Sequence, residues 1–456
     1  MQAKKKLDRM QAWRSILGKH DFHAILARTD DLDGNSAEDA WLYRGKALEG
    51  LCRFDEAATA YAGGLKCFPD SMPLHLALGQ LEIQRGRPKH ALKLLRRGCE
   101  LEPNNLNCYT ARLNLESLDP DGPEAARMLV RALDERKSEA SRARALFFLG
   151  QINVEAKRDR IGFAYYRAGN ALAAKPIDPS RREYSLPRHL LTLSRADFET
   201  ANPAVPECKV IVVAGLPRSG KTMLESMLAE HAAIFPAGEY AGLRRALAKL
   251  DKKRLLEGVR KQASEGRSPF AKAYAKHPLA GVGAGWLVDS SPANLTRLGY
   301  FGMVHPDTPV VLCRRRAPDL GVSLYFKKFK TGHGYTYDLQ SIGRAIALTE
   351  RLIDHWRAVL PNPVLVVDYE DLVSDPEGTR TALFAHLGLE VPARIERKSS
   401  EQDWRVFPGR SPGPGAPISP ALIGFSDRFE GELAPMISAY REMKTALPNA
   451  TRPGPG

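Results

Sequence analysis

The stretch VIVVAGLPRSGKT at residues 210–222 decides the fold of the C-terminal half of this chain. Its first five residues, 210–214, form a short apolar run, which predicts a buried strand. A loop with two glycines follows and leads into a helix that begins near Met223. Glycines let the backbone curl so that several N–H groups point inward, and the N-terminus of the following helix adds partial positive charge. The stretch therefore predicts an anion-binding loop between a strand and a helix.

Further apolar runs follow at residues 286–288, 309–313 and 364–367, and helical stretches separate them. This alternation is typical of a parallel sheet with crossover helices, so residues 207–445 are predicted to form an α/β domain. Residues 446–456, which are rich in proline and glycine, are predicted to be a disordered tail.

The N-terminal half repeats itself with a period of 34 residues. Matching positions are Gly45 and Gly79, Ala57 and Ala91, and Pro69 and Pro103. Small residues at fixed places let two helices pack closely, and the proline ends the second helix, so the pattern is that of tetratricopeptide repeats. The register blurs at Leu113 and Ala125, and a fourth copy is expected from Ala145 to Ala173. Residues 1–175 are therefore predicted to be an all-α repeat domain, and the proline-containing residues 176–206 a linker.

Composition narrows the function classes. The 456 residues carry a net charge of +14, but the basic residues are spread along the chain, which favours an anionic small ligand or acidic substrate over nucleic acid as the partner. Six cysteines without a C-x-x-C pair indicate neither a disulfide framework nor a zinc site. No signal-peptide pattern and no run of about 18 apolar residues is present, so we expect a cytoplasmic protein without a membrane span.

Residues 215–222 match the pattern G-x-x-x-x-G-K-[ST] of nucleoside triphosphatases literally. Under that interpretation the protein is an ATP- or GTP-using enzyme, and Asp368, at the end of the last apolar run, is the candidate for holding magnesium. A repeat scaffold that binds a nucleotide without catalysis is a further alternative.

The same loop also resembles the 5′-phosphosulfate loop of sulfotransferases, especially tyrosylprotein sulfotransferases and bacterial sulfotransferases with tetratricopeptide repeats. Those loops usually read P-R-S-G-T-T, and here Lys221 replaces the first threonine. Residues 311–315 continue to Ser323 and resemble the 3′-phosphate site of this family, in which a guanidinium fork and a hydroxyl hold one phosphate monoester. Because Arg314, Arg315 and Arg316 are adjacent, the register of that fork is open by one residue.

Three more stretches carry the resemblance. Glu239, 21 residues after Arg218, lies where the tyrosylprotein enzymes have their catalytic base. Residues 289–294 resemble the family pattern D-K-x-P-x-N, with Ser290 in place of lysine, and residues 367–372 resemble its closing strand and helix. The order of repeats followed by this domain also matches the bacterial family.

The resemblance implies a sulfotransferase that moves a sulfuryl group from 3′-phosphoadenosine 5′-phosphosulfate to an acceptor hydroxyl of a peptide tyrosine, a sugar or a small metabolite, without a metal. It implies catalytic roles for Glu239, Arg218 and Lys221. The donor-binding residues that it implies are Pro217, Arg218, Ser219, Gly220, Lys221, Thr222, Met223, Arg315, Ser323 and Arg405.

The segment 402–420, which contains Arg405, departs from the family pattern, and either closes over the nucleotide or is only a linker. For the repeats, two interpretations stay open. They form a groove that grips a peptide or carrier protein as acceptor, or they are a spacer or homodimer surface.

Overall fold

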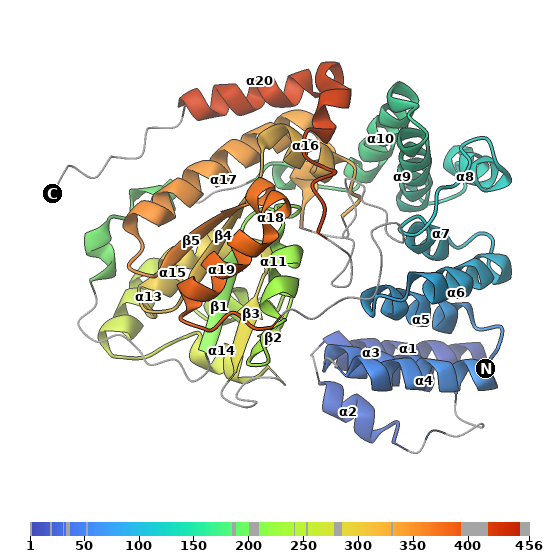
Figure 1. Cartoon of the computed structure of the whole chain (residues 1–456), viewed down its shortest axis with the longest axis horizontal. Coiled ribbons are helices and arrows are strands. Elements are labelled where there is room, and N and C mark those ends of the chain that lie inside the picture. The colour runs from blue at the N-terminus through green and yellow to red at the C-terminus, as the bar shows by residue number, and fades with distance from the viewer. Residues whose placement is uncertain are drawn as a thin grey trace.

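The structure is a computed structural model, in which a stack of helices lies beside an α/β domain (Figure 1). It describes residues 2–18, 21–30, 32, 37–51, 53–184, 188–199, 209–240, 242–251, 254–277, 285–329, 332–393 and 418–446. In these parts of the chain, no helix is both long enough and apolar enough to cross a membrane.

The helical stack contains ten α-helices within the described residues. They are α1 (Gln2–Gly18), α2 (Phe22–Ala27), α3 (Glu38–Gly50), α4 (Phe54–Cys67), α5 (Met72–Gln84), α6 (Pro88–Leu101), α7 (Leu106–Arg112), α8 (Pro123–Leu133), α9 (Glu139–Glu155) and α10 (Asp159–Ala174). The pairs α3 with α4, α5 with α6, and α9 with α10 pack together as the repeat pattern predicts, whereas α8 packs on α9.

Three of the helix pairs pack closely at a glycine of the first helix. A Cβ atom there would lie within 3 Å of the large residue on the second helix, and the pairs are Gly45 with Tyr61, Gly79 with Leu95, and Gly150 with Tyr166. The third copy has Leu113 at the small position, and α7 ends one residue earlier. A branched side chain cannot be accommodated where the other copies place bare backbone, which accounts for the blurred register.

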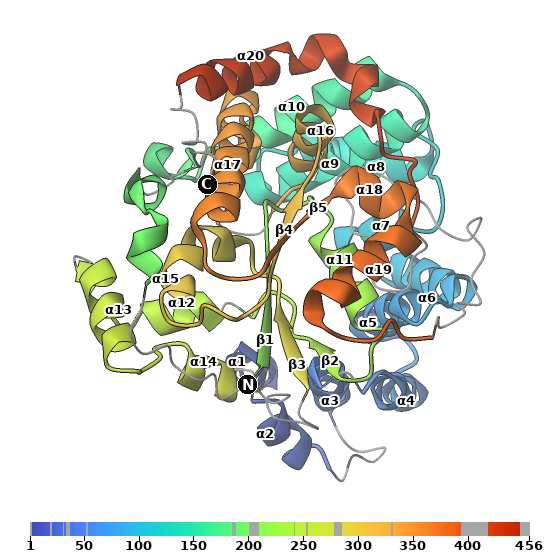
Figure 2. The same ribbon diagram turned by 60° about the vertical axis from the view of Figure 1, so that its left-hand side comes forward.

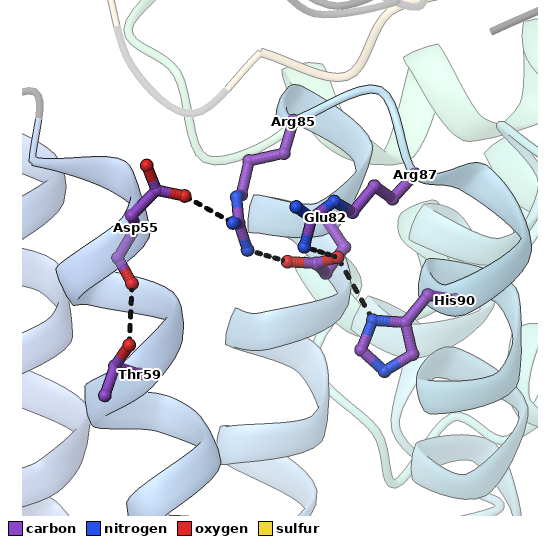
Figure 3. Close-up of polar contacts among 6 residues, drawn as sticks. All are labelled: Asp55, Thr59, Glu82, Arg85, Arg87 and His90. Carbon is purple, nitrogen blue, oxygen red and sulfur yellow. Dashed lines mark hydrogen bonds and ion pairs between the residues drawn. The ribbon is translucent and has the colours of Figure 1, made fainter. Parts of the chain in front are cut away.

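The second pair is also held by a buried carboxylate, which Figure 3 shows. Glu82, near the end of α5, is 1 % exposed and forms ion pairs with Arg85 and Arg87. His90 on α6 contacts the same carboxylate, with 3.0 Å between Nδ1 and Oε2. Arg85 also reaches Asp55 at the start of α4. One buried charge therefore joins two neighbouring repeats.

The α/β domain is built on a parallel five-stranded sheet in the order β2-β3-β1-β4-β5, counted over the described residues. The strands are β1 (Lys209–Ala214), β2 (Ile234–Pro236), β3 (Trp286–Asp289), β4 (Val310–Arg314) and β5 (Val364–Asp368). Four of them coincide with the predicted apolar runs to within one residue. The sequence patterns did not predict β2, because it has only three residues.

Helices cover both faces of the sheet (Figure 2). On β1, Ile211 and Val213 pack under one layer, and Val210 and Val212 under the other. The first layer contains α11 (Lys221–Leu228), α18 (Tyr369–Ser374) and α19 (Pro376–Leu387). The second contains α12 (Gly242–Leu247), α13 (Leu255–Ser264), α14 (Ala271–Ala275), α15 (Leu298–Gly302), α17 (Leu339–Val359) and the 3₁₀ turn η6 (Pro292–Arg297).

The segment between the two domains forms short 3₁₀ turns against the α/β domain. They are η1 (Pro179–Arg181), η2 (Arg188–Thr192) and η3 (Arg195–Phe198). Leu190, Leu193 and Phe198 are buried in the same core as Val210 of β1. This part of the chain therefore packs as a layer of the α/β domain.

The last repeat shares a core with the α/β domain. α9 and α10 pack against α16 (Ala317–Tyr325), η7 (Gly334–Tyr337), η9 (Phe425–Phe429) and α20 (Glu430–Ala446). The ring of Tyr166 stacks on that of Phe326 with 3.9 Å between centroids, and Asn170 Nδ2 donates to the carbonyl of Tyr325 at 3.0 Å. The repeats are thus fixed to the helix that carries Ser323.

Candidate functional site

The loop after β1 is shaped by three residues with positive φ: Gly215 (153°), Arg218 (74°) and Gly220 (99°). A Cβ at Gly215 would lie 2.5 Å from the carbonyl oxygen of Cys313 on β4, so only glycine fits there. Arg218 is a non-glycine residue in the left-handed region, a strained conformation that is often found at functional sites. The loop ends at Gly220, which caps α11.

Lys221 is buried under this loop. Its Nζ donates to the carbonyls of Gly215 and Leu216 at 3.0 and 2.9 Å. Burial lowers the pKa of Lys221 to about 8, while the carboxylates of Glu239 and Glu225 oppose that shift. At neutral pH the loop therefore encloses an ammonium group that carboxylates keep charged.

A second cationic cluster lies beside the loop. Arg218 Nε donates to Ser323 Oγ at 3.0 Å, and Arg315 NH1 donates to the carbonyl oxygen of Arg218 at 3.3 Å. Burial and the neighbouring Arg315 lower the pKa of Arg218 to about 10. The structure thus brings together three residues that the sequence analysis assigned to the donor.

Arg315 is 3 % exposed, and its Nε is a buried donor without a hydrogen-bond partner among the residues that the structure describes. Its guanidinium lies over the ring of Tyr369, with 4.0 Å to the centroid, and NH2 donates to the carbonyl of Leu422 at 3.3 Å. Leu422 is brought there because Asp319 accepts the N–H of Gly424 at 3.0 Å. A buried guanidinium with a spare donor is suited to an anion.

The two neighbouring arginines have other surroundings. Arg314 forms a two-armed ion pair with Asp368 of β5, at 2.6 and 2.8 Å. Arg316 is exposed. Of the three adjacent arginines, only Arg315 faces the loop. Asp368, the candidate magnesium ligand of the triphosphatase interpretation, is therefore already paired with an arginine.

Glu239 follows β2 in an exposed turn, near enough to Lys221 to influence its pKa. The preceding residue, Gly238, donates its N–H to Glu225 Oε1 at 2.7 Å. Ser290 Oγ donates to the other oxygen of Glu225 at 2.9 Å. Ser290, which stands where the related pattern has lysine, therefore contacts a glutamate of α11.

The other expected donor residues are placed as follows. Pro217 and Ser219 are buried in the loop, Gly220 caps α11, Thr222 is exposed at the first turn of that helix, and Met223 is partly buried against the core. Arg405 lies outside the described residues, so its contact stays a prediction. No group of three or more histidine, cysteine, aspartate or glutamate side chains with metal-binding geometry occurs within the described residues.

Sequence reasoning missed His333, Glu225 and Tyr369. Burial lowers the pKa of His333 to about 4, and the charge of Lys221 contributes, so this imidazole is neutral at pH 7. Only the periodicity of α11, which places Glu225 one turn after Lys221, gave a signal for any of the three.

Two family models match parts of the chain. Residues 210–393 match the sulfotransferase family, and residues 38–81 and 72–115 match the tetratricopeptide repeat. The chain thus joins a domain that matches the sulfotransferase family to helices that match the tetratricopeptide repeat. The expected fold class and family resemblance are therefore confirmed.

Two individual proteins are similar to parts of the chain. An uncharacterized protein of Aquifex aeolicus is 26 % identical over 268 residues, which is 52 % of this chain and 33 % of the relative. The chain thus spans about a third of that relative's length. The crystal structure of the sulfotransferase STF1 from Mycobacterium tuberculosis aligns at 12 % identity and a TM-score of 0.29, over 71 % of this chain and 97 % of STF1.

Proposed function

We propose that the sulfotransferase-family domain transfers a sulfuryl group from 3′-phosphoadenosine 5′-phosphosulfate to an acceptor hydroxyl. The observation that carries this proposal is the cluster of Arg218, Arg315 and Ser323 beside the loop. It offers a second phosphate site at the side of the loop, and this donor has phosphate groups at both its 5′ and its 3′ positions.

The residues present fit such a donor. The unpartnered Nε of Arg315 and the hydroxyl of Ser323 supply the donors that a 3′-phosphate monoester needs. The loop, with bare backbone at Gly215 and the N-terminus of α11, supplies N–H groups for the 5′ side. In this proposal Pro217, Ser219, Gly220, Thr222, Met223 and Arg405 complete the donor contacts.

Transfer of a sulfuryl group needs positioning and charge stabilisation more than covalent help. The donor supplies the group to be transferred, together with the leaving phosphate oxygen. Arg218 and Lys221 are proposed to stabilise negative charge on that oxygen. Glu239 is proposed to take the proton of the acceptor hydroxyl as the new O–S bond forms.

The acceptor is proposed to be a peptide or a group on a carrier protein, held by the repeats. Support comes from the core that the last repeat shares with α16, because it fixes the repeats relative to Ser323. A homodimer surface or a spacer is the alternative role.

A ligand comparison tests the donor assignment. Adenosine 3′,5′-bisphosphate at 100 times its dissociation constant is expected to raise the free energy of unfolding by about 2.7 kcal/mol, which a thermal shift detects. Adenosine 5′-monophosphate, which lacks the 3′-phosphate, is expected to bind much more weakly and to give a smaller thermal shift. A larger shift with ATP and magnesium than with the bisphosphate would contradict the proposal.

A further inference from the structure

We infer that Glu225 and Ser290 form a clamp on Gly238 that positions Glu239 for its role as proton acceptor. This inference rests on the proposed function and extends it to two residues that do not touch the acceptor themselves. The clamp is defined as the three-residue hydrogen-bond ring of Glu225, Gly238 and Ser290.

The ring closes through three hydrogen bonds. Glu225 Oε1 accepts the N–H of Gly238 at 2.7 Å, and Glu225 Oε2 accepts the hydroxyl of Ser290 at 2.9 Å. The backbone N–H of Ser290 donates to the carbonyl of Gly238 at 2.9 Å. Both peptide groups that flank the α-carbon of Gly238 are therefore held, one from α11 and one from the end of β3.

Gly238 needs such restraint. It lies at φ 59°, in the left-handed region, and a Cβ there would have no atom within 4 Å. Side-chain packing therefore does not restrict this residue, and glycine has more backbone freedom than any other residue. Without the clamp, the direction in which the next residue, Glu239, leaves the turn would be poorly defined.

The clamp is also buried. Glu225 is 8 % exposed and Ser290 is 4 % exposed. Burial raises the pKa of Glu225, while the hydrogen bonds from Ser290 and Gly238 and the charge of Lys221 favour its ionised form. Each oxygen of this carboxylate accepts one hydrogen bond in a site largely shielded from water, so the clamp holds Gly238 firmly.

Glu225 connects the loop with the turn that contains Gly238 and Glu239. It lies on α11 one turn after Lys221, so one short helix carries both the ammonium under the loop and the acceptor for Gly238. The position of Glu239 is thus set relative to the loop. A displacement of about 1 Å at a reacting group can cost roughly 10²-fold in rate, so such a link matters.

The test uses the full chain with Glu225→Ala, Ser290→Ala and the conservative Glu225→Gln. Glutamine can still accept from Gly238 through its oxygen and donate to Ser290 through its nitrogen. Glu257→Ala and Ser264→Ala on the exposed side of α13 are the matched controls. The first readout is amide hydrogen exchange at residues 234–240, which requires no donor.

If the clamp exists, Glu225→Ala speeds exchange of the Gly238 and Glu239 amides by roughly tenfold or more, Ser290→Ala by less, and Glu225→Gln and the controls by little. The second readout is turnover. Glu225→Ala is expected to lower kcat by about 10–10²-fold with the donor KM unchanged, and Glu225→Gln to restore most of it.

Unchanged exchange in both alanine variants would overturn the clamp. So would a kcat in Glu225→Gln as low as in Glu225→Ala, since that would assign the effect to charge alone. Should Glu225→Ala fail to fold, Ser290→Ala, which removes one hydroxyl, still decides by exchange. A wild-type protein without sulfuryl transfer would contradict the proposed function, while the exchange readout would still test the clamp.

Discussion

The guanidinium of Arg218 donates to the hydroxyl of Ser323 across 3.0 Å, although the two residues are 105 positions apart in the chain. One belongs to the loop after β1 and the other to α16, which follows β4. Because β1 and β4 are neighbours in a parallel sheet, their carboxyl ends meet at one edge, and ligands of such folds bind there. The contact joins the proposed 5′ and 3′ sides of one nucleotide site.

Arg315→Ala should weaken the binding of adenosine 3′,5′-bisphosphate by about 2–4 kcal/mol, because it removes a guanidinium from the proposed site of the 3′-phosphate. Adenosine 5′-phosphosulfate, which lacks that phosphate, should be almost unaffected. Titration calorimetry measures both. Arg316→Ala, at a side chain that is 46 % exposed in the same run, is the matched control. Equal losses for the two ligands would refute the assignment.

Glu239→Gln should keep donor binding and lower kcat by roughly 10²–10⁴-fold, since only the proton acceptor is removed. Steady-state kinetics with a hydroxyl acceptor checks this, with the exposed Glu257→Gln as control. Near-normal kcat in Glu239→Gln would show that another base is used. In that case His333, which is neutral at pH 7 and whose pKa the charge of Lys221 helps to lower, would be the next residue to replace.

Activity should fall at alkaline pH because Lys221 loses its proton there. With a pKa of about 8 this side chain is charged below that pH and loses its proton above it, so kcat/KM for the donor should decline above about pH 8. The Lys221→Thr variant should have a lower kcat/KM, and its pH profile should lack the decline above about pH 8. A wild-type profile that stays flat to pH 10 would show that the charge on Lys221 is not needed.

The buried charge in the second repeat should be important for stability. Glu82→Ala removes one of the two carboxylates that pair with Arg85, whose side chain is only 15 % exposed, and should cost about 2–4 kcal/mol of unfolding free energy (Figure 3). Glu100→Ala, at an ion pair whose glutamate is 64 % exposed, should cost less than about 1 kcal/mol. Urea unfolding followed by circular dichroism distinguishes the two, and equal midpoints would contradict the role of Glu82.

The repeats and most of the sheet could be predicted from the sequence because both depend on local patterns. Gly79 lies 34 residues after Gly45, and the packing reason is visible in the contacts of Tyr61 and Leu95. The short strand β2 has too few residues for a pattern. The choice among Arg314, Arg315 and Arg316 depended on Asp368 in the adjacent strand, a partner that spacing along the chain does not reveal.

The same limit applies to the site. The loop residues and Ser323 were predicted from motifs, whereas Glu225 and His333 reach the site through tertiary contacts. Ser290 was noticed only as a departure from a pattern, and its hydrogen bond to Glu225 became evident from the structure. Residues that act through a neighbour carry no motif of their own.

The most direct test of the central claim is transfer of radiolabelled sulfate from 3′-phosphoadenosine 5′-phosphosulfate, in the presence of cell extract, by the wild-type chain and by Arg218→Ala. The account predicts label on a hydroxyl-bearing acceptor, recovered with protein, that requires the wild-type chain and is lost in the variant. Label that appears equally with both proteins, or with neither, would contradict it.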